Sequence, residues 1–320
     1  MGRTAAHQQH QKYSAGMSLA IIAGMFVFLV CFPASAAAGL ILDAGVRFTY
    51  EDNVIGLLSD QQAAASGGSG NGGSMNVSGI RAGAMNGNGP QGYPNTGGSG
   101  GGSGTGTATG GTGESPSDYS STVSAEAGWF TSLRESSTFF MKGFALYQAY
   151  GRYTFLDTTQ GGISIGIGSD VSKNILLNAS LFGAMKSFDD TLRNSTAYGG
   201  SLSLKERLTP SFWFRQVAEY ERNDADNALF SYSGISGGLA MGYGFSAKTQ
   251  VTLGYNYLVR AFDEPTGQEM RTGTVYLGID QPMGKNWTVS LEYDYQESRD
   301  SVTGATMANN MYSLALRYDY

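Results

Sequence analysis

The last nine residues of the chain alternate strictly between two kinds of side chain. They read Tyr312-Ser-Leu-Ala-Leu-Arg-Tyr-Asp-Tyr320. Successive side chains of a β-strand point to opposite faces, so an aromatic and aliphatic row lies opposite a small and charged row. A strand of this kind needs an apolar medium on one side and a polar medium on the other. This ending therefore restricts the fold to sheets that separate two such media.

A secretory signal peptide is predicted over residues 1–38. An apolar run of about 14 residues follows two basic residues and precedes the small-residue segment Ala34–Ala38, which fits cleavage after Ala36 or Ala38. The run is too short to span a bilayer, which needs about 20 apolar residues. The mature domain is expected to cover residues 39–320.

An exported chain with this ending resembles the bacterial outer-membrane β-barrels. Members of that family end on an aromatic residue, with apolar residues two, four and six positions earlier. The resemblance implies an all-β, antiparallel up-and-down transmembrane barrel in the bacterial outer membrane. A soluble secreted β-domain is the alternative, but it would need a dry core. The barrel-assembly machinery is then expected to recognise the final strand through Tyr312, Leu314, Leu316, Tyr318 and Tyr320.

Removal of the signal peptide leaves a chain without cysteine or histidine, because Cys31, His7 and His10 all lie within it. Disulfides, thiol chemistry and histidine-based catalysis or metal ligation are thereby excluded. The mature chain carries 18 basic and 26 acidic residues, and this acidic balance argues against a nucleic-acid partner. We expect no enzyme activity, no cofactor and no metal.

A low-complexity tract from about residue 59 to residue 118 interrupts the pattern. Twenty of the 47 glycines lie between Gln61 and Asp118, among Ser, Thr, Asn and Ala. Such a stretch buries too little apolar area to offset its ordering entropy. Alternation resumes on both sides, so we interpret the tract as a flexible extracellular loop inside one domain. Its composition is compatible with a position inside the barrel or outside it.

The rest of the chain predicts about twelve strands. Short turns alternate with longer polar loops along the chain, as in outer-membrane barrels with an even number of strands. Strands of about ten residues match the length that crosses the hydrocarbon layer at a tilt. The expected strands are 40–51, 119–131, 137–150, 161–171, 174–186, 195–207, 212–222, 232–245, 250–262, 272–282, 287–298 and 310–320.

Aromatic residues cluster near both ends of these strands, which predicts two interfacial belts. The short-turn belt would contain Trp129, Trp213 and Trp287. The loop-side belt would contain Tyr50, Tyr150, Tyr153, Phe188, Tyr198, Tyr220, Tyr232, Phe262 and Tyr295.

If the apolar faces contact lipid, the charged faces line the lumen. In strand 137–150 both faces are apolar, so its orientation stays open. The small inward residues of strand 232–245 favour an open lumen. The charges either neutralise one another and stiffen the wall, or form a constriction that selects solutes by sign. The lumen-facing candidates are Arg47, Glu126, Lys205, Arg207, Arg215, Glu219, Arg260, Asp280, Glu292, Asp294 and Arg317.

Two acidic segments admit a second interpretation. Asn223-Asp-Ala-Asp-Asn227 has part of the spacing of a calcium loop but lacks its glycine and closing glutamate, so a solvated hairpin loop is favoured. Asp189-Asp190 is interpreted as a loop-surface pair rather than a catalytic dyad.

The favoured function is a small porin-like channel for passive diffusion of hydrophilic solutes. The alternative is a non-conducting barrel that seats a partner or a surface polymer in an exopolysaccharide-export or electron-transfer complex. The first-strand segment Phe48-Thr-Tyr-Glu-Asp-Asn-Val54 resembles the opening strand of barrels associated with exopolysaccharide export. The expected partners are outer-membrane lipid, the assembly machinery and, in the alternative, a surface polysaccharide or periplasmic partner. Because smaller barrels are often monomers, we expect a monomer.

Overall fold

The computed structural model describes residues 38–54, 117–245 and 249–319. The predicted signal peptide, apart from Ala38, lies outside the described residues. The same holds for the glycine-rich tract up to residue 116 and for Tyr320. All statements about the structure below concern the described ranges.

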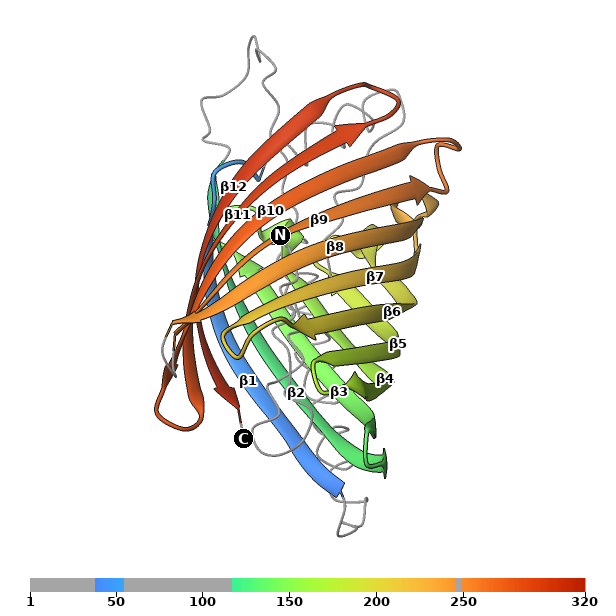
Figure 1. The fold of residues 1–320 in the computed structure, drawn as a ribbon. Coiled ribbons are helices and arrows are strands. Elements are labelled where there is room, and N and C mark those ends of the chain that lie inside the picture. Colours follow the sequence, from blue (N-terminus) through green and yellow to red (C-terminus); the bar gives the residue numbers. More distant parts are fainter. Residues whose placement is uncertain (1–37, 55–116, 246–248, 320) are drawn as a thin grey trace, which may run out of the picture.

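Twelve antiparallel strands form a closed barrel in which each strand pairs with its neighbours in sequence (Figure 1). The predicted fold class and strand number are therefore confirmed. The strands are β1 (Ala38–Glu51), β2 (Asp118–Arg134), β3 (Ser137–Tyr150), β4 (Thr158–Ser172), β5 (Ile175–Phe188), β6 (Ser195–Arg207), β7 (Phe212–Ala225), β8 (Tyr232–Phe245), β9 (Thr249–Phe262), β10 (Glu269–Met283), β11 (Trp287–Asp300) and β12 (Thr306–Asp319).

Closure occurs between the first and last strands. β1, blue in Figure 1, lies beside β12, red, and their register runs from the Asp43–Asp319 pair to the Glu51–Met311 pair. The alternating residues that the sequence places on one face of each strand thus form one continuous ring. A closed sheet has no free edge along these pairs, so the backbone groups there bond to one another rather than to lipid.

The loop-side connections are shorter than predicted because the strands continue for a few residues past their apolar segments. Three of these connections contain a single 3₁₀ turn: η2 (Thr154–Leu156), η3 (Thr191–Arg193) and η4 (Ala228–Phe230). Side chains of Asp190 and Asn227 cap the last two by accepting hydrogen bonds from Leu192 N and Leu229 N. Among the described residues, no helix has the length and apolar character needed to cross a membrane.

The outer surface is mostly apolar over the middle of the strands. Exposed side chains there include Phe48 at 60%, Ile163 at 57% and Leu314 at 48%. Exposure of large apolar side chains on this scale is stable only in a lipid environment. The inner face instead buries polar residues such as Ser290, Gln296 and Asn309.

The predicted aromatic belts are partly wrong. Tyr50, Tyr198, Tyr220 and Tyr295 face outward with Trp129 and Trp287. Nearness to a strand end does not decide the face of a side chain, because the face changes with every residue. The residues of the predicted belts that point into the barrel instead are Tyr150, Phe188, Trp213, Tyr232 and Phe262.

Candidate functional site

The interior wall of the barrel is the candidate functional site. It receives every second side chain of each strand, and many of these are polar or charged. The eleven predicted lumen candidates all occupy the inward positions of their strands, alongside the buried polar residues. β3 directs Phe144 and Leu146 inward and Tyr147 outward, which settles the orientation that the sequence left open.

One cluster of charges lies where the barrel closes. Arg47 Nη1 of β1 is 3.0 Å from Glu292 Oε2 of β11, across the intervening strand β12. Arg317 of β12 lies 3.5 Å from Asp43 and 3.0 Å from Asp319, measured from its Nε. Acid–base pairs thus connect β11, β12 and β1.

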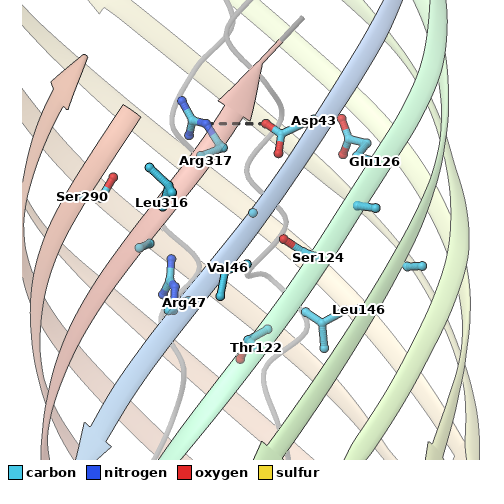
Figure 2. Close-up of a pocket in the computed structure, with 14 residues that line it drawn as sticks. Asp43, Val46, Arg47, Thr122, Ser124, Glu126, Leu146, Ser290, Leu316 and Arg317 are labelled. Atoms are coloured by element: carbon cyan, nitrogen blue, oxygen red, sulfur yellow. Dashed lines mark ion pairs between the residues drawn. The ribbon is translucent and has the colours of Figure 1, made fainter. Parts of the chain in front are cut away.

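Asp43, Arg47 and Arg317 of this cluster line a small cavity on the inner wall (Figure 2). Figure 2 shows Arg317 directed at Asp43, with Glu126 of β2 beside it. The cavity measures about 70 Å³ and is partly lined by Ser124 and Ser290. A space of this size has room for a few water molecules. The charges at this part of the wall are therefore paired with one another beside the cavity.

The neighbouring strands β2 and β3 contribute a further ion pair. Lys142 Nζ lies 2.9 Å from Glu126 Oε1, and both side chains are less than 10% exposed. The Lys142 ammonium also lies 5.4 Å from the centre of the Phe140 ring. Glu126 pairs in register with Asp43 of β1, so this ion pair extends the cluster at the closure.

A second ion-pair cluster lies on the loop side of β5, β7 and β9. Lys186 Nζ contacts Glu221 Oε1 at 2.9 Å and Asn223 Oδ1 at 3.2 Å. Tyr232 donates to Glu221 at 2.7 Å, and its ring lies 5.2 Å from the Arg260 guanidinium. Sequence reasoning selected Arg260 but missed Lys186 and Glu221. Their inward parity, shared with Glu219 and Phe182, is the signal that would have identified them.

Basic residues gather on β6 and β7 near the short-turn end. Lys205 is the register partner of Arg215, and Arg207 is the register partner of Trp213. Lys205 Nζ lies 4.5 Å from the centre of the Trp213 ring, a geometry that favours a cation. These strands lie five or six positions from β1 and β12 in the twelve-strand ring, so positive charge concentrates opposite the acid-rich closure.

Large inner rings lie against the wall rather than across the lumen. A Cβ atom added to any of six inward glycines would come closer than 3.0 Å to an aromatic ring of the adjacent strand. The ring thus covers the position that a side chain would otherwise take. The pairs are Phe130 on Gly39, Phe140 on Gly166, Phe144 on Gly162, Phe182 on Gly199, Trp213 on Gly242 and Tyr276 on Gly254.

Because of this packing, the small inward residues of β8 do not widen the lumen. They were expected to leave the lumen open at that strand. Instead, Trp213 covers Gly242, and Ala240 packs between Trp213 and Tyr276. The space beside the small residues of β8 is occupied by Trp213 of β7 and Tyr276 of β10. A ring can lie against the wall only where the neighbouring residue has little or no side chain.

Charged residues also meet on the outer surface of the loop-side ends. Arg222 donates to both carboxylate oxygens of Asp263, at 2.7 and 2.6 Å, and to Asp224 at 2.7 Å. These hydrogen bonds lower the pKa of Asp263, which lies just beyond β9, below its ordinary value.

Arg193 of η3 is buried and lies close to the rings of Phe188 and Phe230. This burial lowers the pKa of its guanidinium.

The two ambiguous acidic segments have structural partners. Asp224 binds Arg222, Asn227 caps η4 and Asp190 caps η3. Within the described ranges, no group of three or more His, Cys, Asp or Glu residues is arranged to hold a metal ion. The interpretation of residues 223–227 as a solvated hairpin loop is partly wrong, because β7 continues to Ala225 and Asn223 is buried against Lys186.

Neither a protein-family model nor a curated protein sequence matches this chain. Solved structures do match its fold. An outer-membrane channel of the COG4313 group from Pseudomonas putida F1 aligns with a TM-score of 0.53 at 7% identity, covering 90% of this chain and all of that one. The chain has the fold of an outer-membrane β-barrel. Other similar structures are the NanC porin, with a TM-score of 0.44 and 10% identity, and the KdgM porin, with 0.38 and 9%. The NanC alignment covers 62% of this chain and 93% of that one, and the KdgM alignment 63% and 98%.

Proposed function

We propose that this outer-membrane barrel is a porin-like channel for passive diffusion of small hydrophilic solutes. The observation that carries the proposal is the inner wall, which is charged and polar along its strands and keeps its bulky rings flat over glycines. A wall of this kind hydrates a passing solute and leaves the centre of the barrel to water. Passive diffusion needs no catalytic group, and we assign none.

The charges on the wall would sort solutes by sign. Acidic residues dominate near the closure, where Asp43, Glu292 and Asp319 surround two arginines. Lys205 and Arg215 lie on the opposite side of the ring. Opposite charges facing each other across a lumen create a transverse field that orients dipolar solutes and favours ions of one sign.

Single-channel recording of the mature chain in a planar bilayer tests the channel. We expect discrete current steps that scale with salt concentration. A folded protein, identified by its heat-dependent mobility in gel electrophoresis, that gives no current would refute the channel and favour the non-conducting barrel that seats a partner or a surface polymer.

Charge reversal inside the barrel tests the role of the wall. In the variants Arg215→Glu and Arg317→Glu, the reversal potential in a salt gradient should shift toward cation selectivity. Arg271→Glu is the matched control, because that arginine is 58% exposed on the outer surface of β10. An equal reversal potential in all four proteins would contradict selectivity by the inner charges.

We further propose that the barrel-assembly machinery recognises the outer face of β12. This face presents Tyr312, Leu314 and Leu316, which are 53%, 48% and 44% exposed. Surface polysaccharide and periplasmic partners belong to the non-conducting alternative and are expected to matter only if the barrel does not conduct.

A further inference from the structure

Gln216 places an amide on the lipid-facing surface of β7. It is the fifth residue of that strand and is exposed, on the same face as Phe214, Ala218 and Tyr220. Its register partners on the adjacent strands are Leu204 and Leu239, which are both apolar. The amide thus lies within the apolar surface, between the aromatic residues at the two ends of β7.

A second outer amide shows how such a group is normally satisfied. Asn310 is the fifth residue of β12 and also faces outward. Its side chain donates to Asp52 at 2.7 Å and accepts from the Tyr293 hydroxyl at 2.8 Å. For Gln216, no hydrogen bond is found to any residue in the described part of the chain. An amide in hydrocarbon without a partner is strongly unfavourable, since lipid tails neither donate nor accept hydrogen bonds.

A second glutamine amide has the chemistry to satisfy the first. A glutamine amide carries both a donor NH₂ and an acceptor oxygen, so two such groups are self-complementary. Across a two-fold axis each donates to the other, which is the isologous contact of a symmetric dimer. Four residues of strand separate Gln216 from the start of β7, about 10 Å along the membrane normal at the usual strand tilt, and the glutamine side chain is too short to reach the headgroups across that distance.

The surface beside Gln216 allows close approach. Ala218 pairs in register with Gly237 of β8, and both face outward. A Cβ atom added to Gly237 would meet nothing within 4 Å, so the position is open. Small residues next to a polar group are the usual composition of contacts between membrane-spanning segments, because they let two backbones come close.

We propose that two copies of this protein associate through the outer surface of β6, β7 and β8, with the Gln216 side chains bonded to each other across a two-fold axis. The axis runs parallel to the membrane normal. This contact replaces the monomer expected from the sequence. It does not depend on whether the barrel conducts.

Disulfide trapping in native outer membranes tests the interface. Because the mature chain is expected to lack cysteine, Gln216→Cys and Ala218→Cys should each give a covalent dimer on mild oxidation. Val46→Cys is the matched control, since that residue is 38% exposed in the middle of β1, opposite β7 in the ring. Monomers in every variant, or equal crosslinking of the Val46 variant, would overturn the proposal.

A second variant tests the amide itself. Gln216→Leu suits a lipid-facing position and should fold as a barrel. Measured polar contacts between membrane helices give the size of the effect expected when the Gln216 contact is removed. On that basis, the dissociation constant of the Leu variant dimer should be about 3- to 20-fold higher in sedimentation equilibrium. A Leu variant that dimerises as tightly as the wild type would show that Gln216 does not hold the interface.

Discussion

A single methyl group at Gly242 should destabilise the barrel from inside. In the structure, a Cβ atom there would lie 2.5 Å from Nε1 of Trp213 and closer still to two ring carbons. Ordinary carbon contacts are about 3.5–4.0 Å, so the ring must move by about 1 Å or more. Trp213 is only 7% exposed and packs on Ala240 and Tyr276, which hinders that movement.

The expected magnitude follows from this overlap. Overpacking of a well-packed site costs about 1–3 kcal/mol, and displacement of the ring also weakens the 3.4 Å hydrogen bond from Trp213 to Gln250. Gly183→Ala is the matched control, because its methyl group would enter open space on the outer surface of β5. Alanine in a strand is favoured over glycine by about 0.5–1 kcal/mol, so the control should be neutral or slightly stabilised.

Denaturant unfolding of refolded protein in lipid vesicles measures both variants, with tryptophan fluorescence as the signal. We expect the free energies of unfolding of the two alanine variants to differ by about 1–3 kcal/mol, because the preference for alanine over glycine in a strand is common to both. A displaced ring also points further into the lumen, so the single-channel conductance of Gly242→Ala should fall. Equal stability of the two variants would refute the packing of Trp213 on Gly242.

Two further predictions concern ion pairs. Lys186→Met should leave the buried Glu221 carboxylate without its cation and lower the free energy of unfolding by about 3 kcal/mol. The double variant with Glu221→Gln should recover part of that loss. Additive losses in the two single variants and the double variant would show that the pair is not coupled. The lowered pKa of Asp263 means that its bond to Arg222 stabilises the fold above the ordinary pKa of aspartate and is lost as the pH falls through the lowered value. Because this pair is exposed, the wild type should lose only about 0.2–1 kcal/mol there relative to Asp263→Asn, and parallel stability–pH curves for the two proteins would contradict the role of Asp263.

Strand positions were predictable to within a few residues, with the main differences at the loop-side ends. β5, β7 and β11 continue to Phe188, Ala225 and Asp300, beyond the predicted ends at residues 186, 222 and 298. The terminal residues carry polar side chains on both faces, such as Asp224 outside and Asn223 inside. Hydrophobic alternation vanishes there, while backbone pairing continues.

The sequence predicted which residues face the interior but not which of their side chains contact one another. Parity along each strand identified the inward positions of residues such as Arg260 and Glu292. It did not identify which glycine an inner ring covers, since Trp213 and Gly242 meet only through the register of β7 and β8. The direction of a ring near a strand end was also missed, because a shift of one residue moves it from lipid to lumen.

The sequence by itself determined the architecture, because the period-two alternation of apolar and polar residues is a local property that a chain carries before it folds. It likewise determined the number of strands and the alternation of short turns with longer loops. Only the tertiary structure decided which charges meet. Arg47 and Glu292 are 245 residues apart and approach each other because the barrel closes β1 onto β12 in one register. That register depends on the pairing of all twelve strands together, and no single segment of the sequence contains it.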